Sequence, residues 1–114
     1  MRGIRIIWLC LMMPGAAYGQ AQYMNYGRYV DASAMQRSDY ISGLFDALVT
    51  IDRGDNARSA IHFSRCIARS GIKSDHLADG VLRFAQMRPD LHAKPLILAL
   101  LQYLISVCGN PNPQ

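Results

Sequence analysis

Residues 95–108 read PLILALLQYLISVC, and this stretch is expected to form the core helix of the protein. Nearly every residue from Leu96 to Val107 is apolar, which implies packing contacts on several sides. Pro95 fits the first position of the helix, where its missing N–H costs nothing. A membrane span needs about 20 apolar residues, so this shorter stretch favours central burial in a globular domain.

Three further helices are predicted before this stretch, and no segment has the alternating pattern of a β-strand. Ser38 or Asp39 is the expected cap of the first, and Gly71 follows the last turn of the second. The third is expected to begin at a Ser74 cap and to end before Pro89. The three segments span residues 38–51, 57–69 and 74–88, with a polar break at 52–56. The predicted fold is therefore all-α, a small four-helix bundle.

The first 19 residues have the pattern of a secretory signal peptide. Arg2 and Arg5 form a positive n-region, residues 6–13 are an unbroken apolar run, and Ala17-Tyr18-Gly19 forms a small-x-small cleavage site. The apolar run is too short to anchor the chain in a membrane. The mature protein is expected to begin near Gln20 and to be a soluble exported protein without a membrane span.

The mature chain divides into three parts on composition. Residues 20–37 are polar and tyrosine-rich and are expected to form an N-terminal arm that begins extended before it docks onto the domain. Residues 38–108 form the predicted helical domain. Residues 109–114 read GNPNPQ and are expected to be a frayed, flexible tail.

Cleavage of the signal peptide removes Cys10 and leaves Cys66 and Cys108 in an exported protein. Exported proteins meet an oxidising compartment, so a disulfide between these two cysteines is predicted, with two unlinked thiols as the alternative. The cysteines are 42 positions apart. In the chain-entropy model, closing such a loop stabilises the fold by about 4 kcal/mol.

Charge excludes one class of partner. The formal charge of +4 includes Arg2 and Arg5, so the mature chain keeps ten Lys and Arg against eight Asp, a net charge of about +2. The basic residues are scattered singly among aspartates in the sequence, without the contiguous patch that a phosphate backbone requires. Nucleic-acid binding is therefore not expected.

No catalytic, cofactor or metal site is predicted from the residues. His62 and Cys66 share a helix face, but a zinc site needs a further ligand that no spacing supplies. His76 lies among aspartates in the first turn of the third predicted helix, where carboxylates complement the helix dipole. His92 is expected in a solvated interhelical turn. No activated serine or cysteine and no glycine-rich phosphate loop is evident, so the protein is predicted not to be an enzyme.

The run DYISGLFDAL, residues 39–48, resembles the "G-Y-I-x-G-h-x-D-A-L" helix of the Rap/Tai-type immunity proteins. Further blocks follow the order of that family over nearly all of the mature chain. They are Cys66-Ile67, Gly71-Ile72, residues 88–92 (RPDLH), Pro95 and a final helix that ends on Cys108. The chain departs from the family at Ala68, where a proline is usual, and it lacks the N-terminal cysteine of some members.

The resemblance implies a small exported helical protein, related in fold to the HdeA-type acid chaperones. Members bind toxic effectors delivered by type VI secretion, and Tai-type members typically block peptidoglycan amidases. It therefore implies a periplasmic inhibitor that acts by occlusion, with a protein effector as partner and a homodimer as a further expectation. No interface residue carries over, and the loops at residues 52–56 and 89–94 are the candidate contact surfaces.

A second function is also compatible with the sequence: an HdeA-like periplasmic acid-stress chaperone. Eight aspartates and three histidines take up protons as the pH falls, which raises positive charge and self-repulsion. Such a protein exposes apolar surface to its clients in acid, whereas an immunity protein binds one effector near neutral pH.

Overall fold

A computed structural model describes residues 23–51 and 57–112 of the chain, and every regular element in these residues is helical. The elements, in chain order, are α1 (Tyr26–Asp31), α2 (Ala34–Ile51), α3 (Ala57–Ser70), α4 (Ser74–Gln86), the 3₁₀ helix η2 (Pro89–Leu91) and α5 (Leu96–Cys108). The predicted all-α fold is confirmed, but the described residues hold five α-helices where four were predicted. The proposed signal peptide and the break at 52–56 lie outside the described residues.

The additional helix is α1, in the segment predicted to be an extended arm. The Asn25 side chain accepts a hydrogen bond from the Arg28 backbone N–H at 3.1 Å and caps α1. α2 then begins at Ala34, four positions before the predicted Ser38. A reciprocal capping box explains the earlier start. Ser33 Oγ accepts from the Gln36 N–H at 3.1 Å, and Gln36 Oε1 accepts from the Ser33 N–H at 3.0 Å.

The N-terminal segment is docked onto the bundle at three points. The Tyr29 side chain is fully buried, and its hydroxyl donates to the Ala78 carbonyl of α4 at 2.5 Å. The Leu96 N–H donates to the Met24 carbonyl at 2.8 Å. The Tyr26 ring stacks on the His92 ring with 3.9 Å between centroids. Residues 24–31 are therefore packed against the helices of the domain.

His92 lies in the predicted turn but is not solvated as expected. Its ring is half-buried between Tyr26 and the end of α4, and its Nε2 lies 2.7 Å from the Ala85 carbonyl oxygen. The prediction failed because the aromatic partner comes from α1, more than 60 positions away in the sequence.

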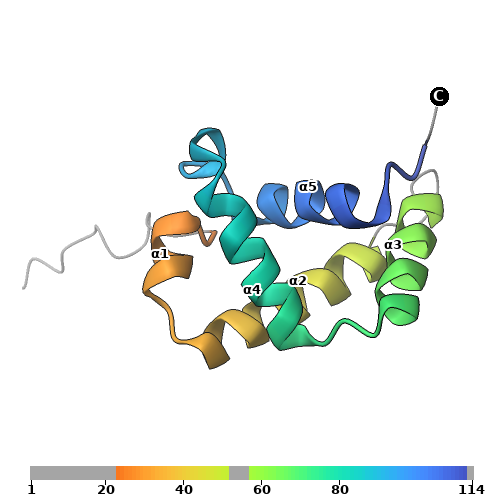
Figure 1. Cartoon of the computed structure of the whole chain (residues 1–114), viewed down its shortest axis with the longest axis horizontal. Coiled ribbons are helices and arrows are strands. Elements are labelled where there is room, and N and C mark those ends of the chain that lie inside the picture. Colours follow the sequence, from red (N-terminus) through yellow and green to blue (C-terminus); the bar gives the residue numbers. More distant parts are fainter. Residues whose placement is uncertain (1–22, 52–56, 113–114) are drawn as a thin grey trace, which may run out of the picture.

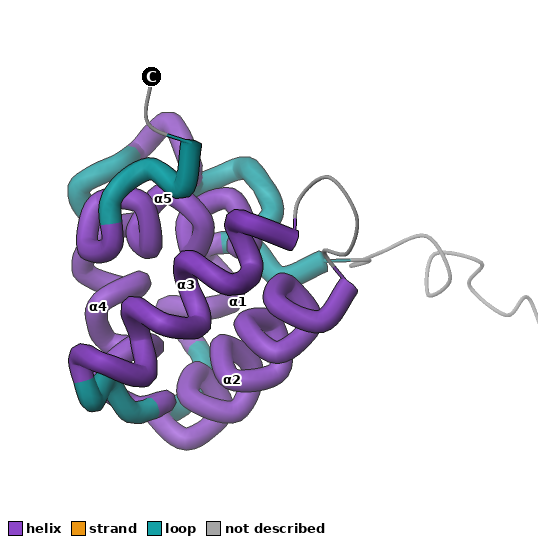
Figure 2. The backbone as a smooth tube through the Cα atoms, turned by 90° about the vertical axis from the view of Figure 1, so that its right-hand side faces the viewer, coloured by secondary structure: helices purple, strands orange, loops and turns teal. Residues whose placement is uncertain are grey.

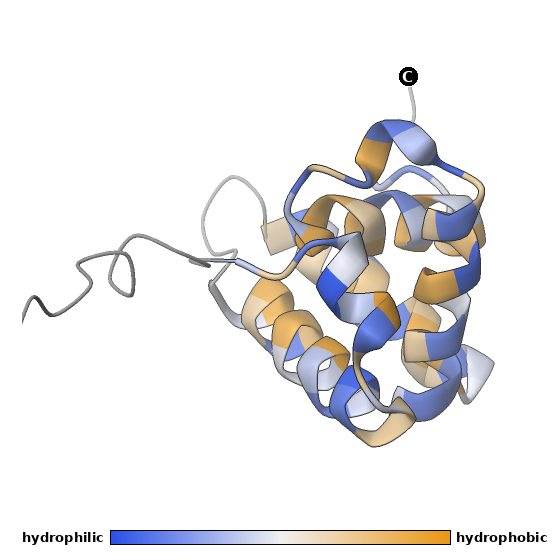
Figure 3. Ribbon diagram, turned by 90° about the vertical axis from the view of Figure 1, so that its left-hand side faces the viewer, coloured by the Kyte–Doolittle hydropathy of each residue, from blue (hydrophilic) through white to orange (hydrophobic). Residues whose placement is uncertain are grey.

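The core lies where α2, α4 and α5 meet, with α2 and α4 crossing beneath α5 (Figure 1). Apolar and polar residues are interspersed along the helices (Figure 3). The core cluster consists of Tyr29, Ile41, Phe63, Leu77, Ala78, Val81, Ala85, Leu91, Leu96, Ala99, Leu100 and Leu104. α5 is the core helix as predicted, although its outer side leaves Leu98, Ile105 and Val107 exposed. α5 nevertheless contacts α2, α3, α4 and η2, so the predicted contact on several sides is present.

A close approach joins α4 to α5. A Cβ atom at Gly80 would lie 2.5 Å from Cζ of Tyr103, so only glycine fits this position of α4. The Tyr103 ring in turn makes an edge contact with Phe84, with 6.0 Å between centroids. Within residues 23–51 and 57–112, no helix combines the length and the hydropathy that a bilayer crossing requires.

Candidate functional site

Helix α3 has two chemically distinct sides. Ala60 and Phe63 are buried against the core, while Arg58, Arg65 and Arg69 are exposed. The arginines are seven and four positions apart, which places them on one side of a helix with 3.6 residues per turn. Figure 2 shows α3 on the outer side of the bundle, with α5 above it and α2 below it. The arginine side of α3 is therefore a surface of the domain.

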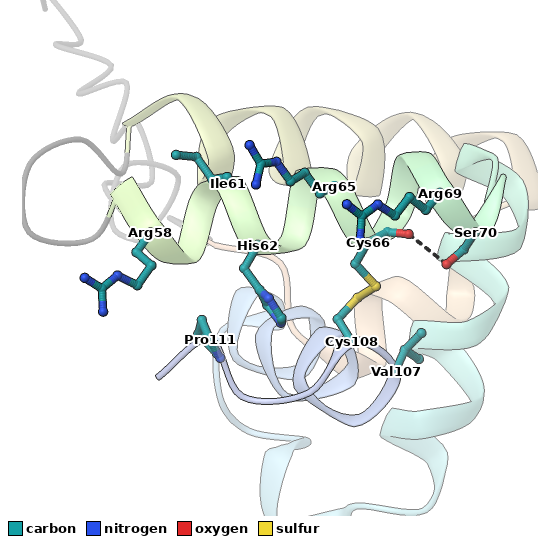
Figure 4. Close-up of a pocket in the computed structure, with 10 residues that line it drawn as sticks. All are labelled: Arg58, Ile61, His62, Arg65, Cys66, Arg69, Ser70, Val107, Cys108 and Pro111. Atoms are coloured by element: carbon teal, nitrogen blue, oxygen red, sulfur yellow. Dashed lines mark hydrogen bonds between the residues drawn. A yellow bond between two sulfur atoms is a disulfide. The ribbon is translucent and has the colours of Figure 1, made fainter. Parts of the chain in front are cut away.

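A disulfide joins α3 to the end of α5, as predicted. Cys66 and Cys108 are bonded with 5.8 Å between their Cα atoms and 42 positions between them in sequence. Because Cys66 is near the middle of α3, the bond lays the C-terminal turn of α5 alongside this helix (Figure 4). The bond therefore brings Val107 of α5 next to the arginine side of α3.

The chain turns back along α3 after α5. Gly109 has φ of 83°, in the left-handed region that favours glycine, and its N–H donates to the Ile105 carbonyl at 2.8 Å. The His62 Nε2–H donates to the Gly109 carbonyl at 3.0 Å. Pro111 lies beyond this contact and is half-buried. Residues 109–111 are therefore held against the domain, which corrects the prediction of a frayed tail for this part.

These elements enclose an open groove of about 540 Å³. One wall is α3, with the three arginines, Ile61 and His62, and the other is Val107 and Pro111, with the disulfide between them (Figure 4). Ile61 is 50% exposed and Val107 is 44% exposed. The groove thus combines guanidinium groups with accessible aliphatic side chains, and none of the described residues that line it is acidic. We call it the arginine groove.

The arginine groove carries the excess positive charge of the described residues. These residues contain nine Lys and Arg and six Asp, and six of the nine basic residues lie outside α3, equal in number to the aspartates. The remaining three are the arginines of α3, and α5 has no charged residue. Over the described part of the chain, ion pairs join Arg83 to Asp79 and Arg88 to Asp90 but involve no arginine of α3.

The sequence-based prediction treated the basic residues as scattered, and this part of it was wrong. Arg58, Arg65 and Arg69 are separated along the chain but share one side of a helix. The signal was available in their helical spacing and in the lack of any aspartate from 57 to 70. What the sequence did not contain was the position of the C-terminal turn, which forms the second wall.

The other predicted side chains do not gather at this groove. Cys66 is bonded to Cys108 and is not available beside His62 as a metal ligand. His76 is exposed in the first turn of α4, next to Asp75. The described ranges contain no group of three or more potential metal-ligating side chains.

The candidate loop at Pro89–Lys94 lies at the opposite end of α5 from the groove (Figure 1). There the Arg88 guanidinium donates to both oxygens of Asp90 at 3.0 and 2.9 Å. This hydrogen bonding holds the pKa of the Asp90 carboxyl below its usual range. The charges of Arg88 and Asp90 therefore neutralise each other, whereas the arginines of the arginine groove have no ion pair in the described residues.

Comparison with known proteins returned no match to a family model, to a curated protein or to a solved structure.

Proposed function

We propose that this chain is an exported, non-enzymatic binding protein: a periplasmic immunity protein that occludes a type VI secretion effector such as a peptidoglycan amidase. The observation that carries the proposal is the arginine groove, a preformed surface feature with both charged and apolar walls. The signal-peptide pattern and the ordered blocks shared with the Rap/Tai-type family support export and the kind of partner.

The composition of the groove favours a protein partner. Arginine is enriched at protein–protein interfaces, because its guanidinium combines a charge, several hydrogen-bond donors and a flat surface that packs well. The strongest contacts of an interface commonly pair such a group with an apolar contact that excludes water. Ile61 and Val107 supply exposed apolar contacts between and beside the arginines.

The groove is also held in shape before any partner arrives. The Cys66–Cys108 bond fixes its floor, and the His62–Gly109 hydrogen bond fixes the turn that forms its second wall. A surface that is already ordered loses less conformational entropy on binding. Inhibition by occlusion needs such a surface and needs no chemical step on the inhibitor.

The test uses the mature chain from Gln20, oxidised, with the cell-wall hydrolase or secreted toxin encoded beside its gene. Calorimetry near neutral pH is expected to show saturable binding, and hydrolysis of purified peptidoglycan is expected to fall to zero at a fixed molar ratio. A neighbouring hydrolase that is neither bound nor inhibited contradicts the proposal, as does the lack of any hydrolase or toxin gene nearby.

The same preparation distinguishes the chaperone alternative. An immunity protein is expected to leave the acid aggregation of an unrelated client, such as malate dehydrogenase, unchanged. Protection of this client at about pH 2 to 3, without inhibition of the neighbouring hydrolase at neutral pH, identifies an acid-stress chaperone instead.

A further inference from the structure

We infer that the arginine groove is the recognition surface of this protein and that its partner presents a row of carboxylates on a protein surface. This inference rests on the proposed function and specifies the partner chemistry. It starts from the grouping of three cations without an ion pair in one groove. Arg28, Arg37, Lys73 and Lys94 also make no ion pair in the described residues, but they do not line this groove. Arg83 and Arg88 are matched by Asp79 and Asp90 within 3 Å, whereas the arginines of α3 have no ion-pair partner in the described residues.

The spacing of the three guanidinium groups defines what they can bind. With a rise of about 1.5 Å per residue, Arg58 and Arg65 are about 10 Å apart along α3, and Arg65 and Arg69 are about 6 Å apart. The row is therefore about 16 Å long. Carboxylates four and seven positions apart on one side of a partner helix have the same rise of about 1.5 Å per residue and match this row. Each guanidinium can then hold a carboxylate with two parallel hydrogen bonds.

The apolar residues of the groove favour a folded or extended protein segment over a simple anion. Ile61 precedes Arg65 by one turn on α3, and Val107 faces α3 from the end of α5. An aliphatic side chain of the partner that covers Ile61 and Val107 removes water from the neighbouring guanidinium groups. Charge pairs in such a desolvated setting contribute more to binding than exposed pairs do.

In the free protein, repulsion between like charges slightly destabilises this surface. Arg65 and Arg69 are four positions apart on α3, where like charges repel each other. No aspartate in residues 57–70 or 96–112 offsets them. Carboxylates from a partner relieve this repulsion, so binding is expected to weaken as salt screens the charges.

The experiment compares two triple variants with the same change in net charge. R58Q/R65Q/R69Q removes the arginines of the groove, and R28Q/R83Q/R88Q removes three exposed or half-buried arginines of α1, α4 and the residue before η2. Glutamine keeps helix propensity close to that of arginine. Far-UV circular dichroism and the melting temperature serve to check that both variants are folded.

The neighbouring hydrolase is the first probe, with its dissociation constant measured at 50 and 300 mM NaCl. The groove variant is expected to bind about 100-fold more weakly than the wild type and to lose most of its salt dependence, because interface arginines are frequent hot spots. The control variant is expected to stay within about threefold. Equal weakening by both variants, or none, overturns the inference while the proposed function stands.

A second probe separates the two proposals if the hydrolase does not bind. A helical 14-residue peptide with aspartates four and seven positions apart is titrated into isotope-labelled protein at 20 mM NaCl. Guanidinium resonances of Arg58, Arg65 and Arg69 are expected to shift, and those of Arg83 and Arg88 are not. Shifts spread evenly over both groups, or binding to phosphatidylglycerol vesicles in preference to the peptide, overturn the inference.

Discussion

Helices α3 and α4 have nearly the same length, 14 and 13 residues, and both pack on α5, but they are attached to it in different ways. α4 buries four residues: Leu77, Ala78, Val81 and Ala85. α3 buries Ala60 and Phe63 and is tied to α5 by a disulfide. The arginine of α4 is paired with Asp79, while those of α3 have no ion pair among the described residues.

This difference indicates that α3 and α4 have different roles in the domain. A helix held by burial must present a wide apolar side to the core, and α4 does so. A helix that is also held by a covalent bond needs less buried surface, so its other sides can carry charge. We therefore assign stability mainly to α2, α4 and α5, and recognition to α3.

Removal of the disulfide is expected to have the largest effect. The double variant C66A/C108A should lose about 4 kcal/mol of unfolding free energy, the chain-entropy value for a closed loop of this length. Urea denaturation followed by circular dichroism measures the loss. In hydrogen exchange, amides of α3 should lose protection well before those of α4. If the amides of both helices lose protection at the same time, the argument that α3 depends on the disulfide more than α4 does is contradicted.

The close contact of α4 with α5 is tested by two glycine substitutions. Gly80→Ala forces a methyl group against Tyr103 and should destabilise by about 1–3 kcal/mol, partly offset by better helix propensity. Gly43→Ala is the matched control in α2, where a Cβ meets no atom within 4 Å, and it should stabilise by up to about 1 kcal/mol. Thermal melts compare the two, and effects of the same sign refute the close-packing argument.

The attachment of α1 to α4 by the Tyr29 hydroxyl can be tested through the pH dependence of stability. Tyr29→Phe removes the hydrogen bond to Ala78 and should cost about 1 kcal/mol at neutral pH. Burial raises the pKa of the Tyr29 hydroxyl above its ordinary value. The unfolded chain therefore releases this proton first, and stability that is present below about pH 10 is lost at higher pH.

Comparing the wild type with Tyr29→Phe isolates the contribution of the Tyr29 hydroxyl, because the other tyrosines titrate in both proteins. Urea midpoints between pH 8 and 11 should fall more steeply for the wild type than for Tyr29→Phe. Parallel slopes would mean that the Tyr29 hydroxyl is not protected in the folded state.

Single arginine substitutions should have the smallest effects on stability, with opposite signs on the two helices. Arg83→Gln in α4 removes a favourable pair with Asp79 four positions before it and should cost about 0.3–0.5 kcal/mol. Arg65→Gln in α3 removes repulsion from Arg69 and should gain about 0.2–0.5 kcal/mol. Both changes in unfolding free energy should shrink in 0.5 M NaCl. If Arg65→Gln loses stability instead, the groove arginines are not without ion-pair partners.

The sequence by itself determined the helical class and the bounds of α3, α4 and α5 to within about three residues, and it predicted the pairing of Cys66 with Cys108. These features depend on local information. A periodic apolar pattern, a proline or glycine at a helix end and the two cysteines that lie after the predicted signal peptide can each be evaluated without knowing what lies nearby in space.

Only the tertiary structure decided how distant segments meet. Docking of α1 through Tyr29 and Tyr26, the partial burial of His92 and the close contact of Gly80 with Tyr103 each join residues from segments far apart in the sequence. The arginine groove likewise needs the turn at Gly109 beside α3. Helical spacing shows which residues share a side of one helix, but the neighbour of that side is set by the packing of the whole domain.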